Sequence, residues 1–145
     1  PQALRADLLK AALAAGDEAL TPALRLSMLD RYAKLLAADN RWQAVAEVLG
    51  RSPLVAGQPI EALLFQARMR LSDFEGAAAV ESRPEVWLDF LAGSVDAAPA
   101  QAVTVAQEIR TRFESLLTDE QRERLESLQN RLTLANRTPR ETPGI

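Results

Sequence analysis

The chain has 145 residues, of which 48% are hydrophobic and 26% charged, so it can form a globular domain of ordinary size. Its net charge is −3, from 17 basic and 20 acidic residues, and neither end is strongly basic, which argues against a nucleic-acid partner. Cysteine and histidine are absent, which excludes disulfides, thiolate zinc sites and any catalytic pair that needs either residue. No apolar run is long enough to span a membrane.

Arginine outnumbers lysine by 15 to 2 and alanine is abundant, which favours a GC-rich bacterial source. The chain begins at Pro1 rather than at a methionine, so we expect a processed or excised part of a larger bacterial protein. No signal peptide is recognisable, and the compartment stays open between the cytoplasm and the periplasm.

Apolar residues spaced three and four apart predict a first helix over residues 4–13, with Gly16 as its end. Thr21 and Pro22 are a start signal for the second helix, because threonine caps free backbone N–H groups and proline fits the first helical position. This helix is expected to end at residues 39–40.

A short helix is predicted over residues 42–49, followed by the longest loop of the chain at residues 51–58. Pro59 restarts a helix, and Ser72 is suited to cap the next one, which begins near Asp73.

A further helix is predicted from Pro84 to a stop at Gly93-Ser94, and a longer one begins at residues 96–99. Residues 118–121 read TDEQ, a capping box that opens the last helix. The tail at residues 136–145 has two prolines and few apolar residues, and it is predicted to be disordered or a linker.

These signals give about eight short helices with almost no strand pattern, so the fold class is all-α. Helices of this length are not stable alone in water and must pack against neighbours. We therefore expect one helical domain over residues 1–135, built from stacked antiparallel helical hairpins.

Two segments share one order of features. Residues 32–53 and 64–84 each contain an apolar helix, a polar corner, an aromatic residue, small residues and a later proline. Trp42 and Phe74 are 32 residues apart, as are Tyr32 and Leu64. A period in the low thirties is typical of two-helix solenoid repeats.

The second segment resembles the centre of a tetratricopeptide repeat. The matching positions are a small residue in the first helix, a turn with an aromatic residue, and a later alanine: Ala67, Ser72, Asp73, Phe74 and Ala77. In the earlier segment Trp42 and Val45 take the last two roles, and Ala33 or Leu35 the first. The resemblance covers residues 24–84 and implies a short tetratricopeptide-like solenoid; the alternative is an irregular right-handed stack of hairpins.

In that family the first helices line a concave groove that grips an extended peptide. The resemblance therefore implies six partner-binding residues: Asp30, Lys34, Gln66, Arg68, Met69 and Arg70. The arginines would hold a carboxylate of the partner. The alternative interpretation is that all six are solvated surface residues.

Two glutamate–serine pairs, at Glu81 and Glu114, resemble the start of lytic transglycosylase active sites, enzymes that also use superhelical domains. A two-residue match is weak, and a solvated charge is the simpler interpretation. The acidic pairs at residues 17–18 and 119–120 sit at or near helix starts and are interpreted as structural. No calcium loop or phosphate-binding loop is present, so neither a metal nor a cofactor is expected.

The prediction is therefore a non-enzymatic protein-interaction or scaffold module whose partner is a peptide segment or a subunit of an assembly. The leucine seam of the last helix, residues 118–135, would cap the stack or mediate self-association. Two alternatives stay open: an accessory or catalytic domain of a cell-wall glycan enzyme, and a purely structural or dimerising spacer.

Overall fold

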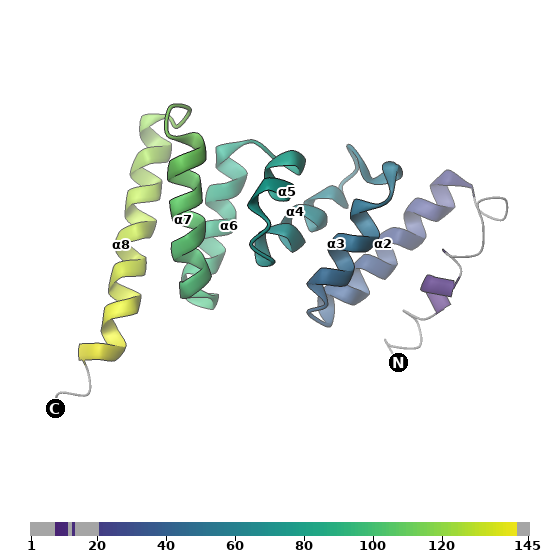
Figure 1. Cartoon of the computed structure of the whole chain (residues 1–145), viewed down its shortest axis with the longest axis horizontal. Helices are drawn as coiled ribbons and strands as arrows, with labels where there is room; N and C mark the ends of the chain where they lie inside the picture. The colour runs from purple at the N-terminus through teal and green to yellow at the C-terminus, as the bar shows by residue number, and fades with distance from the viewer. Residues whose placement is uncertain (1–7, 12, 14–20, 142–145) are drawn as a thin grey trace. The chain divides into compact units, whose positions relative to one another are not determined.

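The computed structural model describes residues 8–11, 13 and 21–141. This described part contains no strand and consists of helices, which confirms the all-α prediction. In chain order they are α2 (Pro22–Ala38), α3 (Trp42–Gly50), the 3-10 helix η2 (Pro53–Val55), α4 (Glu61–Arg70), α5 (Phe74–Val80), α6 (Pro84–Ala97), α7 (Pro99–Phe113) and α8 (Asp119–Glu141) (Figure 1). Residues 8–11 and 13 are helical, while the rest of the predicted first helix, with Gly16, lies outside the described residues.

The chain divides into two compact units, Pro1–Val80 and Glu81–Ile145. The helical-repeat domain expected over residues 1–135 stays a prediction. Each unit buries its own set of apolar side chains. The core of the first unit draws on α2, α3, η2 and α4, and its buried members are Tyr32, Ala33, Leu36, Val45, Leu49, Val55, Ile60, Leu64 and Ala67.

Two corners of the first unit use a residue in the left-handed backbone region. Asn40 joins α2 to α3 with φ 57°, and Ser72 joins α4 to α5 with φ 59°. These residues are 32 positions apart, the spacing found in the sequence. Left-handed geometry is uncommon for any residue with a Cβ, and serine is less suited to it than asparagine.

The hydrogen bonds at the two corners also match. The N–H of Arg41 donates to the carbonyl of Leu36 at 2.9 Å, and the N–H of Asp73 donates to that of Arg68 at 2.8 Å. Each left-handed residue donates three residues back, to Ala37 and Met69. Both corners are therefore complete Schellman motifs, which end one helix and reverse the chain within two residues.

Asp73, rather than the predicted Ser72, caps α5. Its Oδ1 accepts from the N–H of Gly76 at 3.0 Å, while Ser72 occupies the left-handed position before it. Phe74 follows directly and is buried, as is Ala77. The predicted cap was misplaced by one residue because both side chains can cap, and the backbone of the preceding helix end decides between them.

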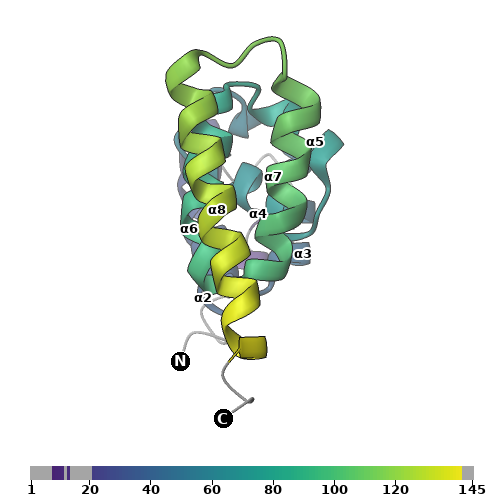
Figure 2. The same ribbon diagram turned by 90° about the vertical axis from the view of Figure 1, so that its left-hand side faces the viewer.

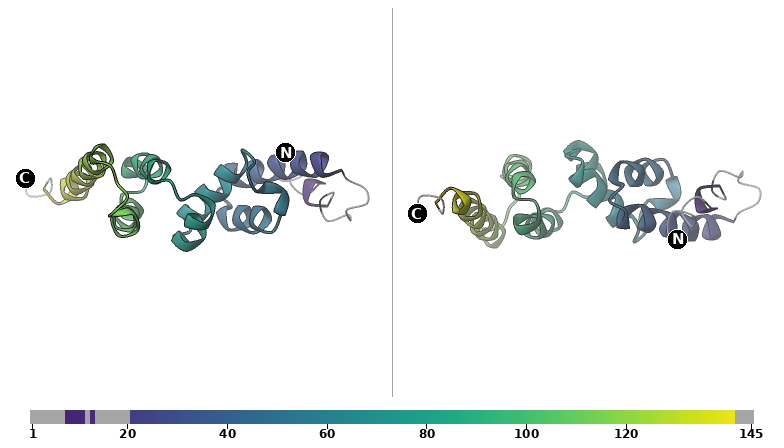
Figure 3. Two further views of the ribbon diagram at one scale, coloured as in Figure 1. Left: turned by 90° about the horizontal axis from the view of Figure 1, so that it is seen from above. Right: turned by 90° about the horizontal axis from the view of Figure 1, so that it is seen from below.

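In the second unit α8 packs against both α6 and α7. Figure 2 shows α7 and α8 side by side and joined at one end, and Figure 3 shows the three helices nearly end-on. The rings of Trp87 and Phe113 meet edge-on at 5.4 Å, and the Trp87 indole N–H donates to the carbonyl of Glu81 at 2.8 Å. The predicted capping box is confirmed, since Thr118 and Gln121 exchange hydrogen bonds of 3.0 and 3.1 Å.

Three predicted helix boundaries differ from the structure. α6 runs through Gly93-Ser94, because the buried Ser94 hydroxyl donates to the carbonyl of Phe90 at 2.9 Å and needs no break in the helix. α4 begins at Glu61 rather than Pro59, since the loop before it contains η2. α8 continues to Glu141, into the segment predicted as a tail; residues 142–145 lie outside the described part.

Ser72→Gly should stabilise the protein by about 1 kcal/mol, because glycine adopts the left-handed conformation without the Cβ clash. The measurement is the free energy of unfolding from urea denaturation followed by circular dichroism. Ser27 is the matched control, since it is exposed within α2. Ser27→Gly should cost about 0.5 kcal/mol. A loss of stability in Ser72→Gly would show that the left-handed corner is not a source of strain.

Candidate functional site

The six residues predicted to bind a partner lie on α2 and α4 of the first unit. On α2, Asp30 and Lys34 form an ion pair of 2.9 Å with each other. On α4, Met69 is fully buried, with an exposed fraction of 0%. The prediction that Met69 lines a groove is therefore wrong; its side chain belongs to the protein interior, because it falls on the same helix face as Phe65.

Arg68 is half-buried and contacts the neighbouring helix α5. Its Nη1 donates to the carbonyl of Gly76 on α5 at 2.9 Å. Its Nη2 lies 3.1 Å from where a Cβ on Gly50 would stand, at the end of α3. A side chain larger than hydrogen at Gly50 would therefore crowd this guanidinium, which joins α4 to α5 by a hydrogen bond and lies close to the end of α3.

The side chain of Arg70 points to a different side of α4 from that of Arg68. Its guanidinium stacks over the Trp42 ring, 4.7 Å from the ring centroid. Two residues along a helix are separated by about 200° around its axis, so Arg68 and Arg70 cannot face one groove. Of the predicted set, Asp30 with Lys34 is the pair that the structure brings into contact, and Gln66 is half-buried on α4.

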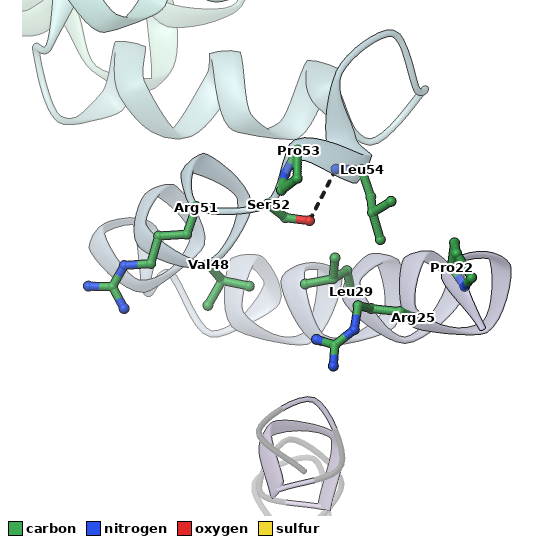
Figure 4. Close-up of a pocket in the computed structure, with 8 residues that line it drawn as sticks. All are labelled: Pro22, Arg25, Leu29, Val48, Arg51, Ser52, Pro53 and Leu54. Carbon is green, nitrogen blue, oxygen red and sulfur yellow. Dashed lines mark hydrogen bonds between the residues drawn. The ribbon is translucent and has the colours of Figure 1, made fainter. Parts of the chain in front are cut away.

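A hollow of about 510 Å³ lies beside α2 in the same unit (Figure 4). Its walls come from the start of α2, the end of α3 and the segment that leads into η2. The lining residues are Pro22, Arg25, Leu29, Val48, Arg51, Ser52, Pro53 and Leu54. The leucines and the valine form an apolar floor, and the two arginines also line the hollow. The Arg51 guanidinium extends outward at the border, away from Leu29 and Leu54 (Figure 4).

Among the residues that the structure describes, the lining of this hollow carries two positive charges and no carboxylate. Arg51 caps the end of α3, is exposed, and makes no side-chain hydrogen bond or ion pair within the part of the chain that the structure describes. Arg25 donates from Nη1 to the carbonyl of Leu13 at 3.0 Å. The sequence did not point to this site because its lining comes from separate segments that only the α2–α3 hairpin and η2 bring together.

Two smaller hollows also border α2. One of about 270 Å³ includes Asp30 and the loop residues Gln58 and Pro59. The other, of about 380 Å³, includes Lys34 and Arg31. Asp30 and Lys34 therefore border different spaces, although their side chains pair across one helical turn.

Neither glutamate of the two Glu-Ser pairs has the environment of a general acid. Arg83 holds both carboxylate oxygens of Glu81, with contacts of 2.7 and 3.0 Å. These hydrogen bonds lower the pKa of Glu81 below its ordinary value of 4.5, whereas a general acid needs a raised pKa. Glu114 is exposed at the end of α7, where its carbonyl accepts from Arg122 at 3.0 Å.

Among the described residues, no group of three or more acidic side chains is placed to hold a metal ion. None of the described helices is both long enough and apolar enough to cross a membrane. In comparisons with known proteins, no family model matched the sequence, and no significant similarity to a curated protein or to a solved structure was found.

Charge reversal at the two arginines of α4 should affect stability unequally. Arg68→Glu should cost about 1–2 kcal/mol, because it removes a part-buried charged hydrogen bond between helices. Arg70→Glu should cost less than about 1 kcal/mol, the usual range of an exposed cation–π contact, and should shift the fluorescence of Trp42. Urea denaturation with hydrogen exchange of the α4 amides measures both.

The exposed Arg41 gives the control for this pair, since it lies at the other end of α3 from Gly50. Arg41→Glu should change stability by no more than about 0.5 kcal/mol. Equal losses in the Arg41, Arg68 and Arg70 variants would mean that net charge, and not the hydrogen bond from Arg68 to Gly76, is responsible.

The titration of Glu81 should occur at a lower pH than that of a free glutamate, because Arg83 stabilises the ionised form. The stabilisation is complete above the ordinary pKa of 4.5 and is lost as the pH falls through the lowered value. Carbon-detected NMR of the carboxyl group measures the midpoint. Arg83→Gln should raise it toward the ordinary value, while Arg110→Gln, an exposed change in α7, should leave it unaltered; an unchanged midpoint in Arg83→Gln would contradict the assignment.

Proposed function

We propose that the chain is a non-enzymatic protein-interaction module that binds a segment of a partner protein on the surface of its first unit. The observation that carries this proposal is the repeated corner. Asn40 and Ser72 adopt the same left-handed geometry with the same hydrogen bonds, 32 residues apart. A helix–corner–helix unit repeated at this spacing supports the tetratricopeptide-like interpretation, in which short helical pairs present a fixed surface.

The preformed hollow beside α2 supports the same function. It is apolar at its floor and bordered by charge, the usual composition of a site that binds a peptide or a small ligand. The core beneath it is closely packed, since Val45 and Leu49 of α3 are buried. A rigid surface loses little conformational entropy when a partner binds, which favours affinity.

The two alternatives have weaker support. A glycan-cleaving role needs an acid that is protonated near neutral pH, and Arg83 keeps Glu81 ionised. A dimerising role would use the leucine seam of α8, but its members Leu125, Leu128 and Leu132 are buried within the second unit. This burial favours the interpretation that the last helix closes its own unit.

Selection from a phage-displayed library of short random peptides tests the proposal. The immobilised chain should enrich a family of related sequences that bind with a measurable Kd. Nuclear magnetic resonance shifts on binding should fall on residues 21–80. The same chain unfolded in urea serves as the control for non-specific binding. No enrichment above that control, or release of sugar products from peptidoglycan by the folded chain, would contradict the interaction role.

A further inference from the structure

We propose that the hollow between α2, the end of α3 and η2 binds an acidic and apolar peptide segment of a partner protein. An apolar side chain of that segment fills the floor, and a neighbouring carboxylate pairs with Arg51. This inference rests on the proposed interaction role and assigns its site and the chemistry of its partner. The site differs from the six residues predicted from the first helices, since none of them lines it.

The apolar floor of the hollow determines that the partner segment must supply an apolar side chain. Leu29 of α2 is buried, while Val48 of α3 and Leu54 of η2 are half-buried and point toward the same space (Figure 4). The volume of about 510 Å³ lies within the range of ligand pockets and accepts one large aliphatic or aromatic side chain with its backbone. Covering Val48 and Leu54 would remove apolar surface from water, which is the main favourable term in such binding.

The arginines at the border of the hollow determine which charge the partner segment must carry. Of the described residues, the charged ones that line the hollow are two arginines and no carboxylate, so a lysine or arginine of a partner would be repelled there. Arg51 stands at the C-terminal end of α3, where the helix carbonyls favour a cation. Its backbone N–H donates to the carbonyl of Leu49, but its guanidinium makes no hydrogen bond or ion pair within the described residues. A planar guanidinium binds a carboxylate through two parallel hydrogen bonds, which fixes direction as well as position.

The backbone of the wall that contains Leu54 is held in place by local contacts. The Ser52 Oγ accepts from the N–H of Leu54 at 3.4 Å, and the next residue, Val55, is buried in the core. Pro53 restricts the backbone between them. The hollow therefore needs no rearrangement of this wall to accept a ligand, and a short linear peptide is sufficient as a probe.

The test uses three fluorescent peptides of equal length and fluorescence anisotropy with the whole chain. The first carries leucines flanked by aspartates, the second has asparagines in place of the aspartates, and the third has lysines. The aspartate peptide should bind at least about tenfold more tightly than the other two, a difference expected of a charge-assisted contact. Its affinity should fall as salt is added.

Arg51→Glu should weaken binding of the aspartate peptide at least about tenfold, and Arg51→Gln should weaken it in the same direction. Arg41→Glu is the matched control, because Arg41 is exposed at the opposite end of the same helix. It should change the affinity by no more than about twofold. Circular dichroism of each variant separates lost binding from lost folding.

Equal losses in the Arg51 and Arg41 variants would overturn the proposal, because they would indicate attraction to net charge. So would tight binding of the asparagine or lysine peptide, or binding to anionic phospholipid vesicles without binding to the aspartate peptide. If peptides from the phage selection bind the Arg51→Glu chain with the same affinity as the unaltered chain, the binding site lies elsewhere. The proposed interaction function would then still hold. No binding by any peptide would contradict both proposals.

Discussion

The first unit depends on the left-handed residue at each of its two corners. A helix can reverse within two residues only if one residue leaves the right-handed region and the freed carbonyls find new donors. Asn40 and Ser72 meet both conditions. Because each reversal is so short, it fixes which residues of the second helix face the first. Val45 and Ala77, 32 residues apart, are accordingly both fully buried.

The arginines of this unit serve different purposes, which sequence position alone does not separate. The Arg68 guanidinium donates to the Gly76 carbonyl of α5, and that of Arg70 lies over the Trp42 ring. Arg51 has neither kind of contact within the described residues and borders an apolar hollow. An arginine held by backbone carbonyls or an aromatic face contributes to stability, whereas one that borders an uncovered apolar floor can still pair with a ligand.

The sequence was sufficient for the elements and for the corner spacing, because these depend on local chemistry. The proline starts at Pro22 and Pro84 and the capping box at Thr118 rest on residues close together in the chain, and the offset between Trp42 and Phe74 repeats one such local pattern. It was insufficient for the site. Met69 and Arg68 were expected on a groove, but Met69 is buried and Arg68 donates a hydrogen bond from α4 to α5. Which face of α4 is covered depends on neighbours that a single helical pattern does not identify.

The candidate hollow follows from the same corner geometry. The Schellman turn at Asn40 brings α3 back along α2, so that Val48 and Leu29 line one hollow (Figure 4). The chain then has to leave α3 and reach α4, and Ser52 and Pro53 shape that exit into a wall. The corner at Asn40, which the hairpin needs in order to fold, thus produces the apolar hollow with arginine at its border. Its floor and wall belong to the packed hairpin, so its shape is set before any partner arrives, and the charge at its border is left to decide which partner binds.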